Sequence, residues 1–223
     1  MPKKPNAGSR RAPTPLDDAA PSSLVPAKRA AEDYPRVEVG SRDELRAWLA
    51  GAHASSRGAW VVTWKKHVTG KHVEAATVAE EALCFGWVDS LPRALDDDRS
   101  MLLVTPRKAK SAWSAVNKQR VERLVAAGLM TPAGLAVVEA AKRSGTWAAL
   151  DAVEALTLPP DLIATFDDAP AVARAHFDTF PRSVKRAILE WIQSAKKPET
   201  RKKRIEETVA LAEKNVRANQ WRP

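Results

Sequence analysis

The chain has 223 residues, of which 44% are hydrophobic, so it is long enough to bury one large core or two small ones. Its formal net charge of +9 favours anionic partners, and its single cysteine, Cys84, excludes an intrachain disulfide framework. No apolar run approaches the roughly 18 residues of a membrane-spanning helix, and no apolar segment follows the basic N-terminal residues as in an export signal. We therefore expect a soluble, cytoplasmic protein.

Residues 1–34 are rich in proline, alanine and basic residues and contain almost no large apolar side chains. Such a segment cannot bury enough surface to offset the entropy lost on ordering, so we predict a disordered basic tail. We predict two further regions, an α+β domain with a β-hairpin over 35–127 and a helical region over 128–218.

The first half of the chain alternates between strand and helix patterns. Residues 37–39 alternate in polarity as a short strand does, and Ser41 with Glu44 forms a capping box for a helix that ends near Gly51. Residues 59–66 are β-branched and aromatic, which predicts a strand. A second capping box, at residues 77 and 80, predicts a helix that runs to about residue 85.

The next two strands, 87–95 and 101–105, are joined by a turn of three aspartates and form a predicted hairpin. Pro92 lacks the backbone N–H that an inner strand needs, so its strand is expected at an edge or at a bulge. The order βαβαββ predicts a small mixed sheet with helices on one face. The predicted fold class is α+β, with an all-helical C-terminal half.

Beyond Pro106 the pattern is purely helical. Apolar residues at 116, 121, 124 and 125 predict a helix that ends at Gly128, and Thr131 with a following proline begins the next. Prolines at 159, 160 and 170 separate short helices, and two longer helices follow from about 182 and from 198. The first of these has an apolar face of Val184, Ile188, Trp191, Ile192 and Ala195.

Charged, amide, hydroxyl and indole groups collect at the ends of the hairpin and at the start of the following helix, where side chains can converge on a ligand. These candidates are Asp89, Arg107, Trp113, Ser114, Asn117 and Arg120. An antiparallel hairpin returns the chain to its starting level, so we expect Asp89 and Arg107 to be close together. A structural ion pair and a ligand-binding cleft are both open interpretations.

Residues 182–204 hold nine lysines and arginines but only two glutamates. One interpretation is a solvated helix face, and the other is a docking surface for an acidic protein, a lipid or a nucleic acid. The basic residues are Arg182, Lys185, Arg186, Lys196, Lys197, Arg201, Lys202, Lys203 and Arg204.

Familiar catalytic and cofactor motifs do not occur. The four histidines are not at metal-ligand spacing with Cys84, and neither HExxH nor CxxC is present. The phosphate-binding patterns GxxxxGK[ST] and GxGxxG and the nucleophile pattern GxSxG are also missing. We therefore predict no metal, no cofactor and no catalytic residue.

Three separated motifs resemble the bacterial YdeI/OmpD-associated, or bacteriocin-protection, family over about residues 36–215. They are EALCFGWVDS, TPRKAKSAWSAVNKQRVERLVAAGLMTPAGL and FPRSVKRAILEWIQSAKKPETRKKRI. The resemblance implies protection against bacteriocins and cationic antimicrobial peptides and, through the family's name, association with an outer-membrane porin. It implies no known reaction. By motif it adds Trp87, Thr105 and Pro106 to the candidate cleft, and it marks Trp191, Lys196, Thr200, Arg201 and Arg204 in the third motif.

We therefore predict a non-enzymatic stress-protection or adaptor protein that binds a partner through the hairpin cleft and the basic helices. One alternative is a small-ligand binder or an enzyme centred on Asp89 and Arg107. Another is a nucleic-acid binder that uses the basic helices, although no nucleic-acid motif is present. A deep polar cleft would favour the former alternative, and a flat basic face would favour a macromolecular partner.

Overall fold

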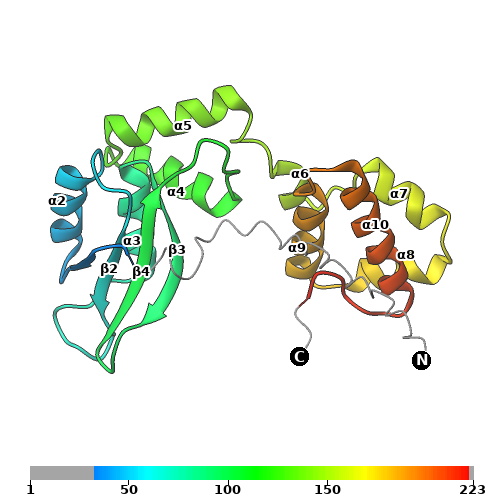
Figure 1. Cartoon of the computed structure of the whole chain (residues 1–223), viewed down its shortest axis with the longest axis horizontal. Helices are drawn as coiled ribbons and strands as arrows, with labels where there is room; N and C mark the ends of the chain where they lie inside the picture. Colours follow the sequence, from blue (N-terminus) through cyan, green and yellow to red (C-terminus); the bar gives the residue numbers. More distant parts are fainter. Residues whose placement is uncertain (1–32, 221–223) are drawn as a thin grey trace, which may run out of the picture. The chain divides into compact units, whose positions relative to one another are not determined.

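The computed structural model describes residues 33–220 (Figure 1), so the predicted N-terminal tail lies almost entirely outside the described residues. The predicted α+β class is confirmed, because the strands lie in the first half of the chain and helices make up the second half. The elements are β1 (Arg36–Glu38), α2 (Arg42–Ala52), β2 (Ala59–Trp64), α3 (Ala75–Cys84), β3 (Trp87–Ala94), β4 (Arg99–Pro106), α4 (Ala115–Ala126), α5 (Pro132–Ser144), α6 (Asp151–Glu154), α7 (Pro160–Asp167), α8 (Ala171–Thr179), α9 (Arg182–Gln193) and α10 (Pro198–Glu213).

The described strands form one mixed sheet in the order β1-β2-β4-β3. β1 runs parallel to β2, whereas β2 and β3 are both antiparallel to β4 (Figure 1). β3 is therefore an edge strand, and its register shifts between Asp89 and Pro92. Both features were expected from Pro92, which cannot donate a ladder hydrogen bond.

The start of α2 follows the predicted capping chemistry. The hydroxyl of Ser41 accepts the backbone N–H of Glu44 at 3.2 Å, and the carboxylate of Glu44 accepts the N–H of Gly40 at 2.7 Å. The first bond satisfies a donor that the helix leaves unpaired at its N-terminus, and the second holds the residue before the cap. The same helix then buries Leu45 and Leu49.

The start of α3 corrects the sequence prediction. The helix begins at Ala75 rather than at Thr77, and the N-cap residue Glu74 makes no side-chain capping bond. Val73 and Val78, on either side of this start, are both buried in the core. Packing of these two valines outweighs the local capping preference at Thr77, as tertiary contacts commonly do. At the other end, Gly86 has a φ of +77°, which lets the chain leave α3 and enter β3.

The helix predicted from residues 116–125 is present as α4, but not all of its apolar residues are buried. Val121 and Leu124 are buried, but Val116 and Val125 are 56% and 49% exposed. On a helix with 100° between successive residues, the first two share a stripe, whereas the other two lie well to its sides.

The N-terminus of α5 is pressed against the C-terminal end of α3. Thr131 caps α5 by accepting the N–H of Gly134, and its hydroxyl donates to the carbonyl of Cys84 at 2.6 Å. A Cβ on Gly134 would meet the Cys84 carbonyl oxygen at 2.3 Å, so only glycine fits this approach. Val138 and Ala141 of α5 join the core that α2, α3 and the sheet share, although α5 lies beyond the boundary predicted at residue 127.

A second hydrophobic core is formed by residues of the helices α6 to α10. α10 packs against α7, α8 and α9 (Figure 1), and its Ile205 belongs to the same buried cluster as Phe166 and Phe177. The face predicted for α9 is largely as expected, because Val184, Ile188 and Ile192 are all buried. Trp191 is only partly buried, and Ala195 follows the end of the helix.

Candidate functional site

Two of the candidate cleft residues occupy ordinary packing positions. Trp87 is 1% exposed, its indole N–H donates to the carbonyl of His53 at 3.2 Å, and its ring meets Trp48 edge-on at 5.9 Å. Thr105 lies opposite Val88 in the β3–β4 ladder and is half-buried. Trp87 therefore belongs to the core of the sheet, and its only polar atom already has a partner.

Arg107 and Trp113 form the closest contact of the predicted cleft. The guanidinium carbon lies 3.8 Å from the centre of the Trp113 ring, and one terminal nitrogen donates to the carbonyl of Ala112 at 2.5 Å. The Nε of Arg107 is buried and has no hydrogen-bond partner within the described part of the chain. Burial lowers the pKa of Arg107 to about 10, and the charge of Asp89 opposes this fall. Asp89 thus acts on Arg107 electrostatically, but no ion pair within 4.0 Å joins them.

The candidate residues at the start of α4 bond to one another. Ser114 is the N-cap and accepts the backbone N–H of Asn117 at 3.4 Å. The side-chain carbonyl of Asn117 accepts from the guanidinium of Arg120, one turn further on, at 3.0 Å. These bonds stabilise the first turns of the helix, which is a structural role for all three residues.

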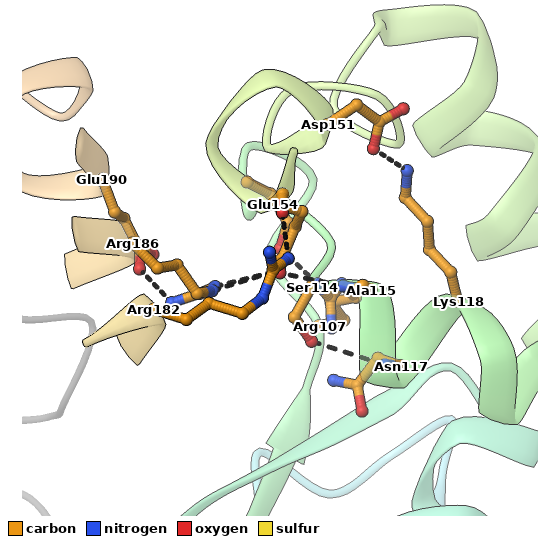
Figure 2. A network of polar contacts seen from close by, with 11 residues as sticks. Arg107, Ser114, Ala115, Asn117, Lys118, Asp151, Glu154, Arg182, Arg186 and Glu190 are labelled. Atoms are coloured by element: carbon orange, nitrogen blue, oxygen red, sulfur yellow. Dashed lines mark hydrogen bonds and ion pairs between the residues drawn. The ribbon is translucent and has the colours of Figure 1, made fainter. Parts of the chain in front are cut away.

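The same helix end is held by a carboxylate that the sequence analysis missed, Glu154 of α6 (Figure 2). Its Oε1 accepts the N–H of Ala115 at 3.4 Å and two guanidinium nitrogens of Arg186, from α9, at 2.9 and 3.0 Å. Arg182 donates to the backbone carbonyl of Glu154. The hydrogen bonds from Arg186 are the main reason why the pKa of Glu154 lies below its ordinary value. This network connects α4, α6 and α9 through one side chain.

A second contact between α4 and α6 lies beside it. Lys118 pairs with Asp151 (Figure 2). Its ammonium also lies 5.5 Å from the ring centre of Trp147. That ring packs against Trp113 at 4.9 Å. Asp151 and Glu154 were missed because the short helix that carries them has too few residues to show a period. Their only sequence signal is the spacing of three, which places two carboxylates on one face.

The basic residues of α9 and α10 fall into two groups. The arginines and Lys185 are engaged: Arg201 makes two bonds to Asp161 at 2.6 and 2.9 Å, and Arg204 lies 5.0 Å from the Trp191 ring and donates to its carbonyl. Lys185 donates to the carbonyl of Asp178. The other lysines, Lys196, Lys197, Lys202 and Lys203, are all exposed.

The most deeply buried charge of the described residues is also one that the sequence analysis missed. Glu81 of α3 is completely buried and accepts from Arg42 at 2.6 Å and from Arg46 at 2.8 Å. Arg46 donates in addition to the carbonyl of Leu129 at 2.7 Å. The neighbouring Cys84 thiol has a raised pKa, chiefly because it is buried, so it is held as an inert thiol.

Two cavities, of about 500 and 370 Å3, lie away from the predicted cleft. Neither is lined by Asp89, Arg107, Trp113 or Asn117. Within residues 33–220, no group of histidine, cysteine or acidic residues has the arrangement of a metal site, and no helix is long and apolar enough to cross a membrane.

Comparison with known families divides the chain in the same way as its two cores. Residues 155–215 match the family described as "Bacteriocin-protection, YdeI or OmpD-Associated". Residues 37–137 match a different one, a domain of unknown function (DUF8412). The resemblance to the first family is thus confirmed for the third motif, while the first and second motifs lie within the other domain. Neither the curated proteins nor the solved structures contain a match to this chain.

Proposed function

From the match of residues 155–215 to the family described as "Bacteriocin-protection, YdeI or OmpD-Associated", we propose that the chain is a non-enzymatic adaptor that binds an acidic protein. Its contact surface is a group of four exposed lysines at the start of α10, the lysine surface: Lys196, Lys197, Lys202 and Lys203. Protection against bacteriocins or cationic peptides is the role that the family's name suggests for such binding.

The observation that carries this proposal is that the ammonium groups of these lysines are free to meet a partner. Lys196, Lys197 and Lys203 make no ion pair or side-chain hydrogen bond within residues 33–220. Lys202 approaches Glu206 only at 3.9 Å, with both side chains more than half exposed. Such a pair contributes little and is easily exchanged for a better one.

The arginines around the lysine surface give it a fixed shape. Arg201 ties α10 to Asp161 of α7, and Arg204 reaches back to the carbonyl of Trp191 and the hydroxyl of Ser194. These bonds hold the turn between α9 and α10 from both sides. The lysines therefore project from a braced turn, so a partner need not order this stretch of backbone when it binds.

The basic charge of this turn, and the cover that Arg204 gives to the Trp191 ring, favour an acidic protein over a nucleic acid as the partner. Residues 194–204 contain six lysines and arginines and one glutamate, a density that accelerates encounter with an acidic surface. Nucleic-acid binding surfaces commonly add an open aromatic ring on which bases stack. Here the ring of Trp191 is partly buried and lies under the guanidinium of Arg204. The lysine surface offers charge without a stacking platform.

A pull-down from nuclease-treated lysate of the native cell tests this proposal. The bait is the tagged chain, the test variant is Lys202→Glu with Lys203→Glu, and the control is Lys108→Glu with Lys110→Glu. The control makes the same change in net charge at two exposed lysines of the loop after β4. We expect an acidic protein to be captured by the wild type and by the control but lost from the test variant, and its capture to weaken as salt is raised.

Capture that is equal for the two double variants would remove the lysine surface from the interface. The same pull-down is run in parallel from untreated lysate, and a protein captured there but not from the nuclease-treated lysate would show that nucleic acid is the partner. Circular dichroism of each variant establishes that the helices remain folded, since exposed helix positions tolerate such changes.

A second candidate function, small-ligand binding beside Asp89 and Arg107, is favoured by one observation. The buried Nε of Arg107 has no partner in the described residues, and a ligand oxygen would satisfy it. Arg107→Lys keeps the charge but removes this donor, so a bound carboxylate compound should be lost from that variant while its melting temperature changes little.

A further inference from the structure

The larger cavity lies on the sheet, between the strand ends nearest the hairpin turn and the start of α3. We propose that this groove binds a small amphipathic organic anion, with a carboxylate head and an apolar body. The site is separate from the lysine surface, and the inference does not rest on the proposed adaptor function. Its volume, about 500 Å3, is in the range of small-molecule sites.

The register of the strands gives the groove a polar end and an apolar end. Thr63 of β2 lies opposite Ser100 of β4, and Val61 lies opposite Leu102, one step further from the hairpin turn. Residues two apart on a strand share a face, so Thr63 and Val61 point to the same side, as do Ser100 and Leu102. Thr63, Ser100 and Leu102 all line the groove. Polarity thus decreases along the groove, away from the turn.

The two hydroxyls at the polar end, those of Thr63 and Ser100, make no hydrogen bond to another described residue. Thr63 is only 7% exposed. Neither hydroxyl oxygen is among the fully enclosed, unpaired side-chain atoms of the described residues, so both reach the space of the groove and can bond to a ligand there. A carboxylate at this level accepts a hydrogen bond from both hydroxyls at once, since they lie directly across one strand pair.

The charge around the polar end is positive. Lys65, Lys66 and His72 line the groove there, and no aspartate or glutamate is among its lining residues. Lys65 is held by a bond to the carbonyl of Asp96 at 2.8 Å, and Lys66 has no ion pair in the described structure. Ala75, the first residue of α3, also lines the groove, so the partial positive charge of the helix N-terminus adds to the field.

The apolar end is continuous with the first core. Val73, Val78 and Leu102 line the groove and are also members of the core cluster around the sheet. An apolar body laid on these side chains is removed from water in the same way as a core residue. Together the two ends select a ligand with one negative head and one hydrocarbon body.

Isothermal titration calorimetry of the full chain tests this site with three probes that share one hydrocarbon chain: octanoate, octanol and octylammonium. We expect octanoate to bind most tightly, octanol more weakly, and octylammonium weakest because its charge has the wrong sign. Thr63→Val keeps the shape but removes the hydroxyl, and should weaken octanoate roughly tenfold, with octanol affected less. Lys66→Gln should weaken octanoate by about threefold, whereas the control Lys110→Gln should leave it unchanged.

Three results would overturn the proposal. They are no heat of octanoate binding at millimolar concentration, equal affinity for octanoate and octylammonium, and unchanged octanoate affinity in both Thr63→Val and Lys66→Gln. Thermal melting of each variant is measured first. If Thr63→Val does not fold, Ser100→Ala, at the half-buried partner position, gives the hydroxyl result in its place.

Discussion

The two cores of this chain handle charge in opposite ways. In the first, Glu81 is fully buried between Arg42 and Arg46, whose own side chains reach the surface. In the second, the carboxylates of Glu154 and Asp161 stay partly exposed and bind arginines at the rim. Removing the partner of a buried charge leaves that charge unpaired away from water, which costs much free energy. A charge at the rim can return to water when its partner is removed. The two regions should therefore respond very differently to the loss of one partner.

The largest expected effect comes from neutralising the buried carboxylate. Glu81→Gln leaves two arginines converging on a neutral amide at a completely buried position, and it should lower the free energy of unfolding by about 3 to 5 kcal/mol. Urea unfolding at pH 7 measures this loss. The matched control is Glu80→Gln, at the next residue, whose contacts with Arg42 and Arg123 are longer and more exposed, at 3.8 and 3.2 Å. Equal effects of the two changes would remove the contrast between buried and rim charges.

The second effect concerns apolar packing in the helical region. Ile188 is completely buried on α9, so Ile188→Ala should cost about 3 kcal/mol. Trp191, one turn away, is only partly buried, and Trp191→Ala should cost about 1 to 2 kcal/mol despite the larger side chain. Chemical denaturation of both variants shows which substitution lowers the free energy of unfolding more. A larger loss at Trp191 would show that its contact with Arg204 matters more than its burial.

Local chemistry made much of this fold predictable from the sequence. Ser41 and Thr131 were expected as helix caps and are caps, since a hydroxyl in that position satisfies a nearby N–H without help from distant residues. Pro92 was expected at an edge or bulge for an equally local reason, its missing donor. These predictions need only the neighbouring residues along the chain.

What the sequence did not reveal depends on contacts between distant elements. The start of α3 was misplaced because burial of Val78 is decided by the sheet, and Glu81 was missed because adjacent glutamates in a helix look equally exposed. The signal that could have located Glu81 is the spacing of Arg42 and Arg46, which puts two arginines on one face of α2. Even so, which glutamate they meet is fixed only by the packing of α2 on α3.

The third prediction concerns the pH dependence of the stability that the partly exposed Glu154–Arg186 pair contributes. Arg186 holds the pKa of Glu154 below its ordinary value of 4.5, so the pair's contribution is complete above that pH and is lost as pH falls through the folded-state pKa. Arg186→Gln should cost about 1 kcal/mol at pH 7, and its difference from the wild type should shrink below about pH 4.5. The control Arg174→Gln, from the more exposed pair with Asp178, should change stability little at any pH. A difference for Arg186→Gln that stays constant down to pH 3 would contradict this assignment.

The smallest effect is expected at the pair on which the predicted cleft was centred. Asp89 makes no ion pair within 4.0 Å in the described residues and acts on Arg107 only through its charge, so Asp89→Asn should change the free energy of unfolding by about 0.5 kcal/mol or less. Arg107→Gln should cost more, about 1 kcal/mol, because it removes the stacking on Trp113. At pH 7 Arg107 stays protonated in the wild type and in Asp89→Asn, since its pKa of about 10 is lowered further by loss of that carboxylate but starts far above neutral. Urea unfolding of the two single variants and the double variant gives their coupling, expected to be a few tenths of a kcal/mol. A coupling above about 2 kcal/mol would mean that the two side chains pair directly, and the hairpin base would then join Glu81 as a site where stranding one charge destabilises the fold.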